Sequence, residues 1–101
     1  MLRKKTSLSL IRVKDSTTID GVRRLETETI MMRATREKIF EQRFENRRVE
    51  DLALVARFRV RGDWQNVRIE HVIWRKRAYR LNRVTLSKSG RYSFIEIGEA
   101  L

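Results

Sequence analysis

The sequence predicts a mainly β protein, a small antiparallel β-barrel of about five strands with one short α-helix inserted before the third strand. Short segments alternate apolar and polar residues at period two, as half-buried strands do, and turn residues separate them. At 101 residues the chain buries only about two thirds of its unfolded surface, which suits one core. We therefore expect a single barrel domain over residues 1–101, with residues 1–6 flexible.

The first two expected strands lie on either side of a polar segment. Residues 7–13 alternate as a strand does. Residues 14–21 collect Asp, Ser, Thr and Gly, which hydrogen-bond their own backbone or tolerate positive φ, so they predict a loop or wide turn. Residues 22–34 are expected to form the second strand. At period two, one face of this strand carries Leu25, Thr27, Thr29 and Met31.

A helix is expected over residues 36–46. Thr35 offers a side-chain oxygen as N-cap, and Glu37 places a negative charge in the first turn. Apolar residues then recur at the spacing of an amphipathic helix, namely Ile39, Phe40 and Phe44. The helix would precede the strand at residues 51–60, which has the cleanest alternation in the chain, with Arg57 and Arg59 opposite its apolar side.

The C-terminal part predicts a meander. Its strands are expected at residues 67–74, 78–84 and 92–97. A tight connection at residues 75–77 joins the first two, and a turn at residues 87–90 precedes the last. Closure into a barrel would remove exposed strand edges that otherwise recruit other chains.

The chain is strongly basic. Its 24 Lys and Arg against 13 Asp and Glu give a formal net charge of +11, so a polyanionic neighbour is expected: DNA, RNA or an acidic protein. The candidate partner- or DNA-facing residues are Arg57, Arg59, Arg61, Trp64, Arg75, Lys76, Arg77, Arg80 and Arg83. A protein interface, a nucleic-acid contact and a solvated face that keeps the barrel soluble all remain open for them.

Reactive side chains are few, since the chain has one histidine and no cysteine. The sequence therefore predicts no catalytic residue, cofactor or metal site, and a protein that is not an enzyme. On a strand, Glu70 and His71 point to opposite faces and are not expected to act together. We interpret His71 as structural, with a site completed by another chain as the alternative. Glu26 and Glu28 share a strand face and are interpreted as solvated.

No targeting or membrane segment is expected. The start of the chain combines basic and apolar residues, but its apolar run is short and broken by Arg12, unlike a secretory signal. Nowhere do about 18 apolar residues follow one another, as a membrane span requires. The lack of cysteine agrees with a reducing compartment.

Five segments in a fixed order resemble one known family. They are TREKIFEQRF (35–44), LALVARFRV (52–60), GDW (62–64), VIWRKRAYRLNRV (72–84) and YSFIEI (92–97). Over about residues 20–97 the chain resembles the head-closure, or head–tail adaptor, proteins of long-tailed bacteriophages. The residues that match the family pattern are Glu37, Phe40, Phe58, Asp63, Trp64, Trp74, Tyr79 and Leu81. The chain departs from it in having Arg-Lys-Arg after Trp74, where a glycine is common, and a slightly long stretch between the two tryptophans.

The resemblance implies a structural virion protein without enzymatic activity. Such proteins are small β-barrels that assemble as a ring, commonly of twelve copies, between the portal–adaptor complex and the tail. The ring retains packaged DNA and provides the tail docking surface. The implied location is the virion neck, and the host cytoplasm during assembly; the implied partners are portal-adaptor and tail proteins, other copies and channel DNA, with no membrane. Contacts would be made by residues 14–24, 33–50 and 75–77.

A small basic nucleic-acid-binding barrel, similar in logic to oligonucleotide-binding folds, is the alternative. In that hypothesis Trp64, Trp74 or Tyr79 would serve as a stacking platform for bases. Tyr79 shares a strand face with Leu81 at period two, which indicates a core position instead.

Overall fold

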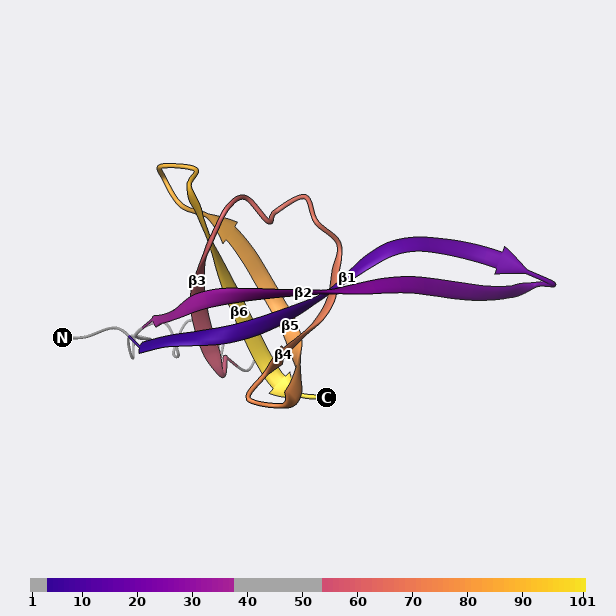
Figure 1. The fold of residues 1–101 in the computed structure, drawn as a ribbon, viewed down its shortest axis with the longest axis horizontal. Helices are drawn as coiled ribbons and strands as arrows, with labels where there is room; N and C mark the ends of the chain where they lie inside the picture. The colour runs from indigo at the N-terminus through magenta and orange to yellow at the C-terminus, as the bar shows by residue number, and fades with distance from the viewer. Residues whose placement is uncertain (1–3, 38–53) are drawn as a thin grey trace.

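The computed structural model describes residues 4–37 and 54–101, and they form one closed antiparallel β-barrel with the strand order β1-β2-β3-β6-β5-β4. The strands are β1 (Lys4–Ile19), β2 (Val22–Glu37), β3 (Ala56–Arg61), β4 (Ile69–Trp74), β5 (Arg77–Leu86) and β6 (Tyr92–Ala100). Figure 1 shows the barrel and a long hairpin of β1 and β2 that leaves it. The predicted β-barrel is confirmed, with six strands instead of about five.

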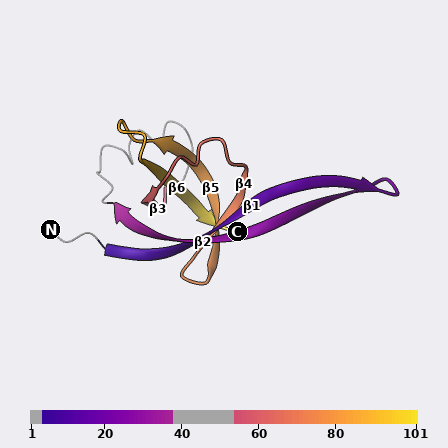
Figure 2. The same ribbon diagram turned by 45° about the horizontal axis from the view of Figure 1, so that its top comes forward.

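The hairpin of β1 and β2 reaches far beyond the barrel. Each strand has 16 residues, yet β4 pairs with β1 only between Leu8 and Arg12, and β3 pairs with β2 only between Ala34 and Glu37. The part of the hairpin from the Arg12–Glu28 pair to its turn, which we call the arm, therefore projects as a two-stranded ribbon (Figures 1 and 2). The molecule measures 53 × 29 × 28 Å as a result.

The prediction of a loop at residues 14–21 is wrong. Residues 14–19 continue β1, and the turn contracts to Asp20 and Gly21 between the paired residues Ile19 and Val22. Both turn residues have positive φ, 51° and 76°, as a two-residue type I′ hairpin turn requires. The β-branched residues just before Asp20 favour an extended backbone. The Asp-Gly pair is a hairpin signal that the polar composition of this segment concealed.

The expected helix does not begin at residue 36. β2 continues through Glu37, and its last residues, Thr35–Glu37, pair with Arg57–Arg59 of β3, so Thr35 is a strand residue and not an N-cap. Residues 38–46 of that expectation lie outside the described residues. No helix occurs in the part of the chain that the structure describes.

The start of the third strand and the extent of the N-terminal segment also differ from the predictions. The third strand, expected from residue 51, begins at Ala56, while residues 51–53 lie outside the described part. Of the N-terminal residues expected to be flexible, Lys4–Thr6 belong to β1 and pair with Ala34–Arg36.

Alternate residues of the strands fill the barrel. The core consists of Leu8, Leu10, Ala34, Ala56, Phe58, Val60, Val72, Trp74, Ile95 and Ile97. Phe58 is fully buried and meets Trp74 edge to face, with ring centroids 5.0 Å apart. The Trp74 indole nitrogen donates a hydrogen bond to Thr6 Oγ1 at 3.1 Å, so its polar atom is satisfied inside the barrel.

Candidate partner-binding surface

The outside of β3 and β6 carries a surface of arginines on aromatic rings. Because Ala56, Phe58 and Val60 fill the interior, the alternate residues of β3, which are Arg57, Arg59 and Arg61, point outward. β6 lies beside β3 and presents Tyr92 and Phe94 on the same side. We call these five residues the arginine–aromatic face.

Two guanidinium groups stack on these rings. Arg57 lies over Phe94 at 4.2 Å from the ring centroid, and Arg59 lies over Tyr92 at 5.0 Å. Each such cation–π contact is worth roughly 0.5–1 kcal/mol at an exposed site. The stacking fixes the orientation of both guanidinium groups. Nε of Arg57 is buried, so of these two arginines Arg59 is the better placed to offer N–H donors to a carboxylate or phosphate.

A buried carboxylate lies beside this face. Glu96 of β6 is only 1% exposed, although its register partners are Arg57 on β3 and Arg83 on β5. Both Nε and Nη2 of Arg83 lie 3.3 Å from Glu96 Oε2. Arg83 therefore neutralises Glu96, while its own side chain remains 48% exposed.

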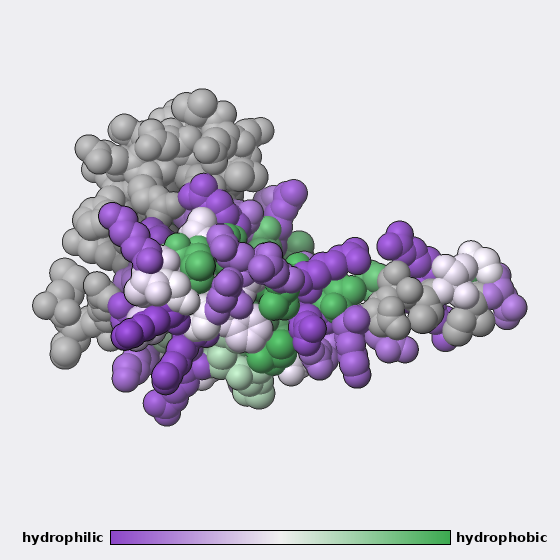
Figure 3. All heavy atoms as spheres, turned by 90° about the horizontal axis from the view of Figure 1, so that it is seen from above, coloured by the Kyte–Doolittle hydropathy of each residue, from purple (hydrophilic) through white to green (hydrophobic). Residues whose placement is uncertain are grey.

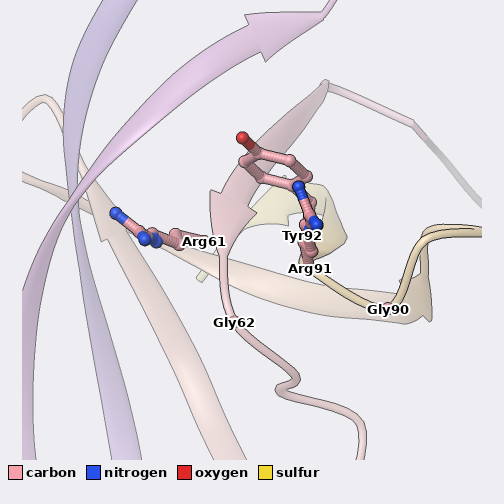
Figure 4. Close-up of a pocket in the computed structure, with 5 residues that line it drawn as sticks. All are labelled: Arg61, Gly62, Gly90, Arg91 and Tyr92. Carbon is pink, nitrogen blue, oxygen red and sulfur yellow. The ribbon is translucent and has the colours of Figure 1, made fainter.

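Arg61 sits at the edge of a shallow hollow. The hollow is lined by Arg61, Gly62, Gly90, Arg91 and Tyr92. In Figure 4 the Arg61 side chain points away from Arg91 and Tyr92. Because the two guanidinium groups do not converge, the hollow does not form a compact anion-binding site.

Trp64 secures the loop that follows β3. Its indole nitrogen donates to the carbonyl of Arg61 at 2.8 Å, and its backbone N–H donates to Ser93 Oγ at 2.9 Å. Ser93 is fully buried and donates in turn to the carbonyl of Gly62 at 2.7 Å. Trp64 also packs against the core, so its role in the barrel is to hold this loop.

The other predicted cations lie on or near the β4–β5 hairpin. Its two-residue turn, Arg75 and Lys76, lies at the bottom of Figure 1, whereas the β5–β6 turn, next to Tyr92, lies at the top left. Arg75 stacks over Trp74 at 4.3 Å. Arg77 is exposed, and Arg80 lies 3.9 Å from Glu99, where both side chains are largely solvated. The predicted site residues therefore separate into two groups and do not form one patch.

The β4–β5 turn holds two non-glycine residues in the left-handed region. Arg75 has φ 53° and Lys76 has φ 63°, a conformation that costs roughly 1–2 kcal/mol for each residue with a Cβ. The connection expected at residues 75–77 comprises only Arg75 and Lys76, because Arg77 already pairs with Trp74. The pairing of Trp74 with Arg77 sets the register of β4 against β5.

Lys76→Gly is expected to raise the free energy of unfolding by about 0.5–1 kcal/mol, because glycine removes the strain and its greater freedom in the unfolded chain offsets only part of the gain. Urea unfolding measures the change. Lys88→Gly is the matched control, since Lys88 is an exposed turn residue outside the positive-φ positions. A less stable Lys76→Gly protein would show that the turn carries no such strain.

The aromatic residues expected as stacking platforms face the core. Trp74 is 4% exposed, Tyr79 packs on it with centroids 5.9 Å apart, and Trp64 is half-buried. The aromatic residues that accompany the outward arginines of β3 are Tyr92 and Phe94, and neither was among the predicted site residues. Their alternation with the buried Ser93 and Ile95 would have placed them on the outer face.

The prediction that Glu70 and His71 cannot meet is wrong. Ile11 of β1 pairs with His71 and the next residue, Arg12, pairs with Ile69, so Glu70 is a bulged residue. A β-bulge breaks the alternation and re-aims side chains. The Glu70 carboxylate consequently contacts Nδ1 of His71. Among residues 4–37 and 54–101, no group of three or more His, Cys, Asp or Glu could hold a metal ion.

The two acidic residues of β2 differ in their surroundings. Glu28 Oε1 lies 2.7 Å from Nη1 of Arg12, an exposed ion pair at the base of the arm. Glu26 is exposed further along the arm. An exposed pair of this kind contributes little stability, roughly 0–1 kcal/mol.

Comparisons with known proteins yield no relative. A scan against models of protein families, a search of curated proteins and a search of solved structures each found no match. In the described part of the chain, no helix has the length and apolar character to cross a membrane. The functional assignment therefore rests on the sequence pattern and the geometry of the barrel.

Proposed function

We propose that this protein is a head-closure or head–tail connector component of a long-tailed bacteriophage, a structural protein that forms a ring between the portal–adaptor complex and the tail. The ring retains packaged DNA and offers the tail its docking surface. The observation that carries the proposal is a closed barrel with two separate outer features, the arginine–aromatic face and the arm. The order of segments that resembles the head-closure family supports it independently.

A ring needs two different surfaces on each copy, because a head-to-tail contact joins unlike patches. The arm and the arginine–aromatic face are unlike in shape and in charge. Arginine and tyrosine are enriched among the anchors of protein interfaces, where they combine contact area with directed hydrogen bonds. In this proposal, the arginine–aromatic face binds an acidic rim of a neck or tail protein.

The alternative is a nucleic-acid-binding barrel. One observation favours it, since Tyr92 is 39% exposed next to Arg59 and a base could stack on its free side. Against it, Trp74 is buried in the core, and Trp64 and Tyr79 pack against the core. A single accessible ring supplies little of the stacking energy that single-strand binding uses.

The first experiment measures binding of the purified chain to purified portal–adaptor complexes from the phage whose genome encodes it. Co-sedimentation is expected for the natural chain. The double variant Arg57→Glu, Arg59→Glu is expected to weaken it at least about tenfold, since both stacked cations become repulsive. Arg68→Glu is the matched control, because Arg68 is an exposed cation just before β4, outside the arginine–aromatic face and outside the predicted site residues.

DNA binding of the same proteins separates the two functions. If the barrel neutralised about five phosphates, the logarithm of its DNA affinity would fall with the logarithm of salt concentration at a slope of about −4 to −5. Tight, steeply salt-dependent binding by a monomer that ignores portal–adaptor complexes would reject the connector and support the alternative. A gene neighbourhood without portal, adaptor or tail genes would count against the connector as well.

A further inference from the structure

Beyond Val13, whose backbone N–H donates to the carbonyl of Arg68 at 2.8 Å, the arm is a two-stranded ribbon that pairs with no third strand of the described chain. β4 ends its pairing with β1 at Arg12, and β3 reaches β2 only at Ala34. An isolated two-stranded hairpin is at best marginally stable in water, and it becomes stable when a face packs against a further layer. Figures 1 and 2 show the arm projecting away from the barrel in both views. A packing partner for the arm is therefore expected outside this barrel.

One face of the hairpin is free of charge over its middle. On β2 it consists of Leu25, Thr27, Thr29 and Met31, and on β1 their cross-strand partners include Ser9, Ile11 and Val13. We call the four β2 residues the uncharged face. Leu25 is 47% exposed and Met31 76% exposed, and hydrophobic residues are visible at the base of the arm in Figure 3. Depletion of charge at the centre of a patch is typical of protein interfaces.

The opposite face of β2 is different. It carries Arg24, Glu26 and Glu28 at the alternate positions. Because 37% of the residues in the chain are charged, this segregation gives the hairpin one face suited to solvent and one suited to another protein surface.

The charge of the arm indicates which protein surface packs against it. Residues 12–28 contain four cations and four carboxylates, so the arm is neutral while the whole chain carries +11. Two copies that met barrel to barrel would bring strongly cationic surfaces together. The neutral arm is a segment that a second copy can approach with little like-charge repulsion.

The dimensions of the molecule also agree with a second copy of this chain as the partner. The longest dimension, 53 Å, exceeds the next, 29 Å, by nearly the width of one barrel. The arm of one copy can therefore lie across most of the width of a neighbouring barrel. A contact of this kind joins unlike surfaces, which allows copies to follow one another around a ring.

We propose that the uncharged face of the hairpin packs against a second copy of this chain. The inference rests on the proposed function for its ring geometry and deepens it by naming the contact between copies. Leu25, in the arm, and Met31, on β2 just outside the base of the arm, would be covered in the assembly, and the charged face of the arm would stay in solvent.

Sedimentation equilibrium of the isolated protein, up to about 1 mM, tests the contact over the range of weak association. The mass of the natural chain is expected to rise with concentration. Leu25→Arg is expected to weaken association at least about tenfold by placing a charge in a desolvated contact. Val22→Arg is the matched control, because Val22 is an exposed apolar residue of the same strand on the opposite face, and it should remain within about twofold of the natural chain.

Met31→Arg provides a second test at the other end of the face, and far-UV circular dichroism verifies that each variant is folded. A natural chain that stays monomeric throughout, or equal association of Leu25→Arg and Val22→Arg, would overturn the inference. A monomeric chain that still binds portal–adaptor complexes would overturn only the contact between copies. A self-associating chain that ignores those complexes would instead reject the proposed function.

Discussion

Phe58→Ala is expected to lower the free energy of unfolding by about 3–5 kcal/mol, the usual cost of removing a buried phenyl ring. Phe58 is fully buried at the centre of the barrel, where its ring meets Trp74 edge to face at 5.0 Å. The alanine leaves a cavity, and the strands of a closed barrel cannot easily move inward to fill it. A domain of this size is typically stable by only about 5–15 kcal/mol, so the loss is a large share of the total.

Urea unfolding monitored by circular dichroism measures this loss. Met31→Ala is a matched control, because it also shortens an apolar side chain of a strand, but one that is 76% exposed. The free energy of unfolding of Met31→Ala is expected to change by no more than about 0.5 kcal/mol when the protein is dilute. Equal losses in the two variants would show that Phe58 does not occupy the barrel interior.

Ser93→Ala is expected to lower the free energy of unfolding by about 1–3 kcal/mol, although it removes only one oxygen atom. Ser93 Oγ accepts a hydrogen bond from the backbone N–H of Trp64 and donates one to the carbonyl of Gly62. Without the hydroxyl, these backbone groups lose their partner in a site that water does not reach freely. The loop after β3, which carries Trp64, should loosen.

Thermal unfolding and hydrogen exchange at Trp64 measure the two effects. Ser7→Ala serves as the control, because Ser7 lies exposed on the outer side of β1. Its expected change is within about 0.5 kcal/mol. Unchanged stability and exchange in Ser93→Ala would mean that the serine bridge does not hold the loop.

Local alternation was enough to predict the strands and the interior of the barrel. Residues 56–60 alternate apolar and charged side chains, and Ala56, Phe58 and Val60 are buried on the predicted apolar side. The outward direction of Arg57 and Arg59 followed from the same period. Side chains on a strand point to opposite sides in turn, so this information is contained in a few neighbouring residues.

Local patterns failed where the backbone departs from that period. The polar segment before Asp20 was expected to be a loop, yet an Asp-Gly turn and β-branched residues make it the end of β1. The bulge at Glu70 brought its carboxylate to His71 against the expected alternation. A bulge depends on the register with the neighbouring strand, so the residues around Glu70 do not predict it.

Composition and the period-two geometry of an extended backbone predicted a small, strongly basic β-barrel and the core side of residues 56–60. Which strands are neighbours depends on how the whole barrel closes. Closure placed β6 beside β3 and so brought Phe94 and Tyr92 under Arg57 and Arg59. It also left the arm without a third strand, since pairing between distant segments depends on the whole barrel and not on any local pattern.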